Sequence, residues 1–100
     1  MSHFLLFYDF VDDYLERRPQ FRDAHLKAAW ASVSGGDMVL AGALADPADT
    51  GLLLFKGDTA EAAEAFARTD PYVVNGLVKS WTVRQWTTVV GPDASMKVMP

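Results

Sequence analysis

The alternation of hydrophobic and polar positions predicts four strands, beginning with an aromatic and aliphatic run at His3–Tyr8. This run is short and is followed by an acidic segment, which is typical of a largely buried strand. Apolar runs at Met38–Leu44 and Gly51–Phe55 are separated by a loop of turn-forming residues, so they predict an antiparallel hairpin. The last run, Lys79–Val90, is rich in β-branched and aromatic residues and predicts the fourth strand.

A first helix is predicted between the first two apolar runs. Asp12 or Asp13 begins a short helical turn that ends near Arg18, because a carboxylate can accept hydrogen bonds from the free N–H groups of a helix start. Pro19 suits the first turn of a second, longer helix, where its missing N–H is not needed. The longer helix ends at the glycine pair 35–36, since glycine permits the left-handed conformation that often terminates a helix.

The next helix is predicted in an alanine- and glutamate-rich segment that runs to about Thr69. Asp58 and Glu61 have the spacing of a capping box, so the helix is expected to begin at residue 58 or 59. Asp70 comes directly before Pro71, whose ring disfavours the helical conformation for the preceding residue. The helix therefore breaks at Asp70, and a short turn follows.

The order of these elements predicts the fold class. Strand, helix, strand, strand, helix, strand within 100 residues is typical of a ferredoxin-like α+β sandwich, with an antiparallel sheet and both helices on one face. The domain is expected to cover residues 1–90, and residues 91–100 are expected to form an irregular tail. Because the strands are apolar at nearly every position, the other sheet face should also be covered, most simply by a second copy in a homodimer.

Composition narrows the classes of partner. The net charge is −4, and the nine Lys and Arg residues form no basic stripe, which argues against nucleic acid as a ligand. The absence of cysteine excludes disulfides and thiolate chemistry and fits a reducing cytoplasm. The apolar run Met38–Ala45 is far shorter than the roughly 20 residues of a membrane helix, and residues 1–8 lack the pattern of a signal peptide. We therefore expect a cytoplasmic protein that binds no membrane.

His25 is the residue that simple packing explains least well. On a helical wheel it lies near the centre of a face whose other members are Phe21, Ala24, Ala28, Ala29 and Ser32. Such a face packs against a sheet, where both imidazole nitrogens need hydrogen-bond partners or water. Two interpretations stay open: a core histidine bonded to a backbone carbonyl, or a functional histidine paired with a carboxylate. Asp70 is the matching carboxylate, although it is also a good cap for the turn that follows it.

Four short motifs, in order along the chain, carry a resemblance to a known family. They are Arg22-x-x-His25-Leu26, Leu40-Ala41-Gly42, Asp70-Pro71-Tyr72 continuing to Gly76-Leu77, and Val83-Arg84-x-Trp86. With these motifs the sequence resembles the YciI-like (YCII-related) family over nearly its whole length. The resemblance implies a dimeric α+β barrel related in shape to muconolactone isomerases, with a catalytic His-Asp pair. Some relatives in this family are linked to the dehalogenation of chlorinated hydroxyquinols, and the resemblance implies related chemistry here.

Two functions follow from this reading. The first is a cofactor-independent lyase or isomerase, dehalogenase-like in some relatives, acting on a small aromatic or lactone-like molecule. His25 is then the general acid and base, Asp70 orients it, Arg22 holds an anionic group, and Tyr72 and Trp86 form an aromatic wall. The alternative is a non-catalytic small-molecule-binding or assembly module that uses the same pocket without proton transfer.

The remaining polar clusters indicate no cofactor. Asp9, Asp12, Asp13 and Glu16 lack the spacing of a calcium loop, and carboxylates at a helix start are favoured by the helix dipole alone. His3, at the start of the first strand, is expected to face solvent. Neither a phosphate-binding glycine loop nor a serine nucleophile motif is present. The sequence therefore predicts neither a metal site nor an organic cofactor.

Overall fold

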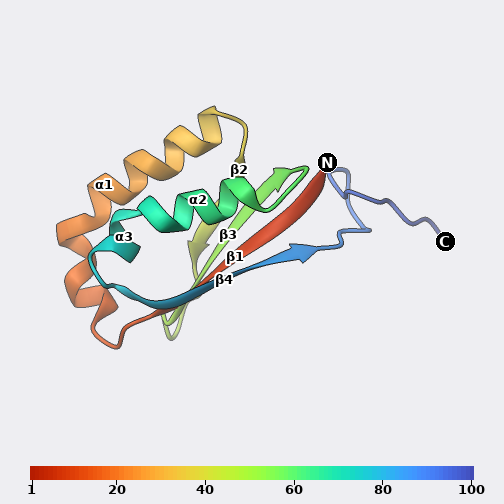
Figure 1. The fold of residues 1–100 in the computed structure, drawn as a ribbon. Coiled ribbons are helices and arrows are strands. Elements are labelled where there is room, and N and C mark those ends of the chain that lie inside the picture. The colour runs from red at the N-terminus through yellow and green to blue at the C-terminus, as the bar shows by residue number, and fades with distance from the viewer.

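The computed structural model describes residues 1–100 as a four-stranded antiparallel sheet with all helices on one face (Figure 1). The strand order is β2-β3-β1-β4, which is the order of a ferredoxin-like fold. The predicted α+β fold class is therefore confirmed. The elements are β1 Ser2–Phe10, α1 Tyr14–Ser34, β2 Met38–Ala43, β3 Thr50–Gly57, α2 Glu61–Thr69, α3 Pro71–Val74 and β4 Val78–Trp86.

The first helix is continuous and contains Pro19, so the prediction of two separate helices was wrong. A proline inside a helix removes one hydrogen bond, here the bond to the carbonyl of residue 15. Leu15, whose carbonyl would have accepted that bond, lies on an exposed part of the helix and is 54% exposed as a residue. The helix ends where it was expected to, at Gly35. No helix of this chain combines the length and the apolar character of a membrane span.

The second helix begins at Glu61, after the predicted start, and the capping box with Asp58 does not form. Instead, the N–H of Glu61 donates to the hydroxyl of Thr59 at 3.3 Å. The predicted break at Asp70 is confirmed, because Asp70 is extended, with φ −61° and ψ 127°, and it separates α2 from α3. The short helix α3 then ends at Val74, with Asn75 as its cap, and Gly76 follows with a φ of +79°, which glycine adopts readily.

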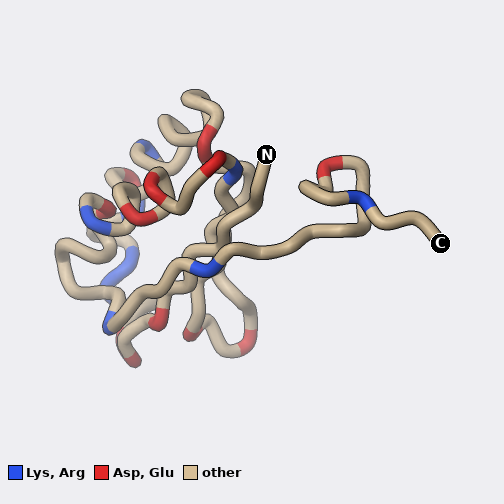
Figure 2. Tube along the Cα trace, turned by 45° about the vertical axis from the view of Figure 1, so that its right-hand side comes forward, with Lys and Arg blue, Asp and Glu red and all other residues tan.

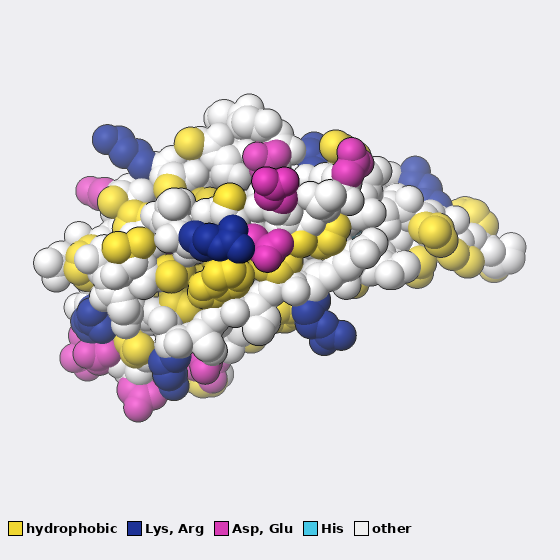
Figure 3. Space-filling model, in the orientation of Figure 1, with side chains coloured by type: hydrophobic (Ala, Val, Ile, Leu, Met, Phe, Trp, Pro, Cys, Tyr) yellow, Lys and Arg dark blue, Asp and Glu magenta, His cyan; other side chains and the backbone are white.

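The last strand ends at Trp86, four residues before the predicted end at Val90. It pairs only with β1, and the last pair in the register is His3 with Trp86. Because β1 itself begins at Ser2, residues 88–100 have no strand beside them. Residues 87–100 contain no helix or strand, and this segment extends away from the body of the molecule (Figure 2). Hydrophobic side chains are exposed at this end of the molecule (Figure 3), among them those of Val90, Met96 and Met99. His3 is buried, with Nδ1 bonded to the Thr88 hydroxyl at 2.6 Å, so its predicted exposure to solvent was wrong.

The core lies between the sheet and the helices. Strand β1 alternates, so that Leu6 and Tyr8 are almost fully buried under the helices whereas Leu5 and Phe7 lie half-buried on the opposite face. A Cβ at Gly51, beside β1, would lie 2.8 Å from the ring of Phe10, so only glycine fits there. The buried core consists of Phe4, Leu6, Tyr8, Phe10, Tyr14, Ala29, Met38, Leu53, Phe55, Ala63, Ala67, Tyr72, Leu77 and Val78.

Candidate active site

Asp70 lies at the junction of α2 and α3, with its side chain completely shielded from solvent. Pro71 keeps Asp70 out of the helical conformation and occupies the first position of α3, where a missing N–H is tolerated. The Asp70 carboxylate then accepts a hydrogen bond from the N–H of Tyr72 at 3.1 Å and caps α3. The local sequence therefore fixes both the position and the direction of this carboxylate.

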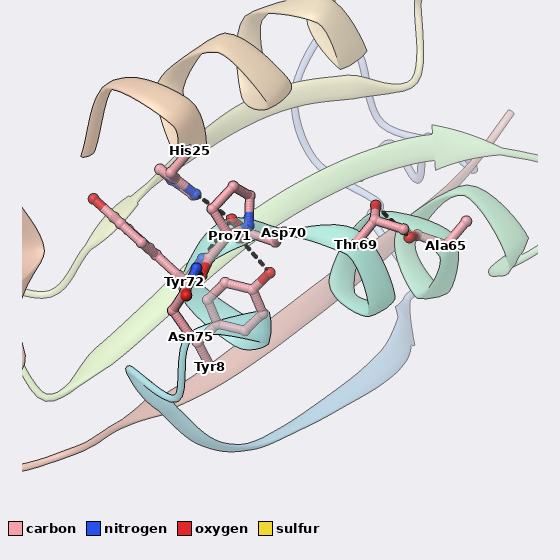
Figure 4. A network of polar contacts seen from close by, with 8 residues as sticks. All are labelled: Tyr8, His25, Ala65, Thr69, Asp70, Pro71, Tyr72 and Asn75. Atoms are coloured by element: carbon pink, nitrogen blue, oxygen red, sulfur yellow. Dashed lines mark hydrogen bonds and ion pairs between the residues drawn. The ribbon is translucent and has the colours of Figure 1, made fainter. Parts of the chain in front are cut away.

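Two further side chains converge on the same carboxylate (Figure 4). The hydroxyl of Tyr8, from β1, donates to Oδ2 at 2.7 Å. On the other oxygen, Nδ1 of His25, from α1, lies 2.8 Å from Oδ1. Asp70 thus joins three elements that are distant in sequence, and no buried polar side-chain atom of the protein lacks a partner.

The direction of the hydrogen bonds in this network follows from the donors and acceptors present and from the burial of Tyr8. Burial raises the pKa of Tyr8 far above its ordinary value, and the charge of Asp70 together with their hydrogen bond raises it further. Tyr8 therefore remains a phenol and donates to the carboxylate. Three donors are the arrangement that suits an ionised carboxylate, which can only accept. Because a carboxylate can only accept, Nδ1 is the nitrogen of His25 that donates in this contact, and Nε2 is the nitrogen that remains free to exchange a proton.

The imidazole of His25 is held by aromatic packing. It stacks on the ring of Tyr72, with centroids 3.8 Å apart and planes 7° from parallel, and it meets Phe66 edge to face at 6.3 Å. The side chain is 14% exposed, and Nε2 has no hydrogen-bond partner within the chain. Because every buried polar side-chain atom is paired, Nε2 must reach open space. His25 is one of the residues that line a cavity between α1 and the sheet, so Nε2 is available to a molecule bound there.

The cavity, with a volume of about 350 Å³, lies between α1 and the sheet edge formed by β2. Most of its lining is hydrophobic, and it includes five Phe, Tyr or Trp side chains: Tyr8, Phe10, Tyr14, Trp30 and Tyr72. Its only charged lining residues are Arg18 and Arg22, and no Asp or Glu lines it. A cavity of this size and chemistry suits a small, largely apolar molecule that carries negative charge.

The pKa of Tyr72, which lines this cavity, reflects the burial and the charges around it. Burial raises the pKa of Tyr72 to about 12, and the charge of neighbouring Tyr14 acts in the same direction. The positive charges of Arg22 and Arg18 oppose this rise, because they favour the ionised phenol. Both guanidinium groups therefore act on the space around the Tyr72 hydroxyl.

The structure brings together four of the five predicted site residues. His25, Asp70 and Tyr72 are in direct contact, and Arg22 lines the same cavity. Asp70 both caps a helix and binds His25, so its two interpretations, as a cap and as the partner of a histidine, apply at the same time. The partner of His25 is therefore a carboxylate and not a backbone carbonyl.

Trp86 lies elsewhere, and the expected aromatic wall of Tyr72 and Trp86 does not form. Trp86 pairs with His3 and shares the outer sheet face, away from the helices, with Leu5 and Leu54. There it lines a separate hollow of about 330 Å³.

Sequence reasoning missed two members of this region, Tyr8 and Arg18. The signal for Tyr8 was its place in an alternating buried strand, since a buried hydroxyl requires a partner. The signal for Arg18 was its spacing of four residues from Arg22, which places both side chains on the same face of α1. The acidic residues near the start of α1 form no group of three or more metal-binding side chains, and no such group occurs elsewhere.

Comparison with known proteins agrees with the observed fold. A family model described as the YCII-related domain matches residues 1–87. Among solved structures, the chain resembles 5-chloro-2-hydroxyhydroquinone dehydrochlorinase, TftG, from Burkholderia phenoliruptrix AC1100 in complex with 2,5-dihydroxybenzoquinone. The TM-score is 0.72 at 18% identity, covering 86% of this chain and 94% of that one.

A second similar structure comes from a Nitrosomonas europaea protein that its name describes as a candidate antibiotic biosynthesis monooxygenase. Here the TM-score is 0.59 at 15% identity, covering 86% of this chain and 96% of that one. At these identities the similarities establish a shared fold. No curated protein matches the sequence.

Proposed function

The chain belongs to the YCII-related domain family, and from that premise we propose that it is a cofactor-independent lyase or isomerase that moves a proton by means of His25 and Asp70. The observation that carries the proposal is the buried carboxylate of Asp70. It accepts from Nδ1 of His25 at 2.8 Å, while Nε2 is left unpaired at a cavity. Such a pair is the arrangement of a general base whose orientation is fixed by its second nitrogen.

In the proposed reaction, Nε2 of His25 takes a proton from a bound substrate and later returns it or releases it to water. The imidazolium formed in this step is stabilised by the carboxylate of Asp70, which lies in direct contact with Nδ1. Tyr8 and the N–H of Tyr72 hold that carboxylate in place, so little reorganisation is needed when charge develops. Arg22 is the proposed anchor for an anionic substituent of the substrate.

The proposed substrate is a small aromatic or lactone-like molecule. The similar dehydrochlorinase acts on a chlorinated hydroxyhydroquinone, and that chemistry is supported here by the aromatic lining of the cavity. In the keto tautomer of such a ring, Nε2 takes the proton of a ring hydroxyl, and the electron pair of that O–H bond forms a C=O bond. The ring double bond then shifts to the carbon that carries chlorine, and the C–Cl bond breaks with its electron pair on chloride, which leaves a hydroxyquinone. The net loss is HCl, so no redox partner or cofactor is required.

The proposal includes a homodimer that closes into an α+β barrel through the outer sheet faces. Leu5, Leu52 and Leu54 lie half-buried on that face, and Leu40 and Trp86 are 71% and 48% exposed beside them. An apolar sheet face of this kind is normally covered, and an identical face on a second copy is the simplest cover.

The test is chloride release from 5-chloro-2-hydroxyhydroquinone, with Asp70→Asn as the matched variant. Wild-type protein is expected to release chloride, and the variant to do so at least about 100-fold more slowly. Nitrogen NMR of the ring should also find hydrogen on Nδ1 in the wild type and lose that preference in Asp70→Asn.

No turnover of this substrate or of a panel of lactones, with ligand binding that survives Asp70→Asn, would contradict proton transfer. That outcome would favour the alternative of a binding module. An unchanged tautomer in Asp70→Asn would show that Asp70 is a structural cap only.

A further inference from the structure

Arg18 and Arg22 are unusual among the arginines of this protein. They lie one turn apart on α1, both line the cavity, and neither makes an ion pair or a hydrogen bond within the chain. By contrast, neighbouring Arg17 donates to the backbone carbonyls of Asn75 and Gly76. Like charges at this helical spacing repel each other. Two unpaired guanidinium groups at one cavity are therefore a feature that the fold itself does not require.

Arg18 is also oriented before any ligand arrives. Its guanidinium carbon lies 5.5 Å from the centre of the Tyr14 ring, within the range of a cation–π contact. Tyr14 is fixed in turn, since it stacks on Phe10 with centroids 3.7 Å apart and planes 8° from parallel. A guanidinium that is held over an aromatic ring loses less conformational freedom when it binds an anion than a free side chain does.

The same aromatic rings continue to the proposed base. Tyr14 meets the ring of Tyr72 edge to face at 5.8 Å, and Tyr72 stacks on His25 at 3.8 Å. The cavity wall therefore runs from the guanidinium of Arg18, across aromatic rings, to the imidazole. A planar ring placed along this wall would have its charged substituents near the arginines and a reacting proton near Nε2.

We infer that Arg18 and Arg22 together form a two-guanidinium subsite, and that the ligand is a planar aromatic or quinonoid dianion with two ionised oxygens. Guanidinium groups bind ionised oxygens through directed, charge-assisted hydrogen bonds, and two of them distinguish a dianion from a neutral ring. The inference rests on the proposed function, because it assigns a substrate class to that cavity. It adds Arg18 to the site and makes the charge of the ligand the main determinant of specificity.

The test measures binding alone, by isothermal titration calorimetry at neutral pH. The probe is 2,5-dihydroxybenzoquinone, whose two acidic hydroxyls ionise, and the neutral comparison is 2,5-dimethoxybenzoquinone, which has no ionisable group. The variants are Arg18→Gln and Arg22→Gln. Arg68→Gln is the matched control, since it removes one positive charge from the surface of α2, where Arg68 pairs with Glu64. Arg18→Lys keeps the charge but loses the planar group.

The dianion is expected to bind the wild type at least tenfold more tightly than the dimethoxy compound. Each cavity variant should weaken dianion binding about tenfold, and the double variant more than either, with no change for the neutral compound. Arg68→Gln should change dianion binding less than twofold, and Arg18→Lys should fall between wild type and Arg18→Gln. Added salt should weaken dianion binding to the wild type more than to either variant.

Equal binding of the two probes by the wild type, or dianion binding that Arg18→Gln and Arg22→Gln leave unchanged, would overturn the subsite. Because no step of this test requires proton transfer, its failure is distinct from failure of the proposed function. Chloride release that depends on Asp70 would survive loss of the subsite. Likewise, if the protein shows no turnover, dianion binding that depends on the two arginines would still support the subsite.

Discussion

The two faces of the sheet differ in how completely this single chain covers their side chains and pairs their polar groups. On the helix-covered face, Tyr8 is almost fully buried and its hydroxyl is bonded to Asp70, so both the apolar and the polar groups are satisfied. On the outer face, neighbouring Phe7 and Leu5 are only half-buried, and Trp86 is 48% exposed. The chain therefore builds a complete core and a buried polar network on one side, and leaves an apolar surface on the other. Chemistry is expected on the first face and association on the second.

The largest expected difference between the faces is in activity, and the two histidines of the chain test it. His25→Gln removes the proposed base and should lower the turnover measured by chloride release about 10²- to 10⁴-fold. His3→Gln is the matched control, because His3 bonds Thr88 on the other side of the molecule and should leave turnover unchanged. Equal losses in the two variants would break the assignment of chemistry to the helix-covered face.

Leu53 and Leu54 are adjacent on β3 and face opposite ways, so they compare packing on the two faces. Leu53 is 3% exposed, and Leu53→Ala should lower the free energy of unfolding by about 2–5 kcal/mol at any protein concentration. Leu54→Ala should cost less and should matter mainly through the proposed dimer, so its effect should grow with protein concentration. Urea unfolding at two concentrations, with light scattering for the mass, measures both. A monomeric wild type at high concentration would contradict the proposed role of the outer face.

The buried carboxylate of Asp70 should contribute more to stability than the exposed carboxylate of Asp9 on β1. Asp70→Ala leaves the hydroxyl of Tyr8 and the N–H of Tyr72 without their acceptor, and should lower the free energy of unfolding by about 2–3 kcal/mol. Asp9→Ala is the control, since Asp9 is exposed on β1 and should have no measurable effect. Urea unfolding compares the two variants, and equal stabilities would show that the network carries no net stabilisation.

The smallest effect is expected from alkaline pH, and it should also come from the helix-covered face. The folded-state pKa of Tyr72 is raised to about 12, above its ordinary value of 10.0, so the folded protein keeps this proton at a pH where the unfolded chain loses it. The stability that this provides is fully present below pH 10 and should be lost as the pH rises toward 12. Urea unfolding from neutral to alkaline pH measures the loss, and Tyr72→Phe should make it shallower. An identical pH dependence in that variant would rule out Tyr72 as its source.

Much of the fold could be predicted because it depends on local chemistry. The break at Asp70 follows from Pro71 alone, and the four apolar runs follow from composition over a few residues. The wrong predictions concern two places where the local sequence does not decide the structure, the proline inside α1 and the end of β4. Pro19 lies inside α1, where it removes one hydrogen bond of the helix, and β4 stops at Trp86, because β1 extends only one residue beyond His3.

For the candidate site, the sequence by itself determined which chemical groups were available and the face of α1 on which His25 lies. It also determined that Trp81 and Trp86, five residues apart in a strand, point to opposite faces. Only the tertiary structure decided which of those faces carries the helices, because strand register is a property of pairing between distant segments. For the same reason, only the tertiary structure placed the hydroxyl of Tyr8 and the imidazole of His25 on one carboxylate, 62 and 45 residues away along the chain.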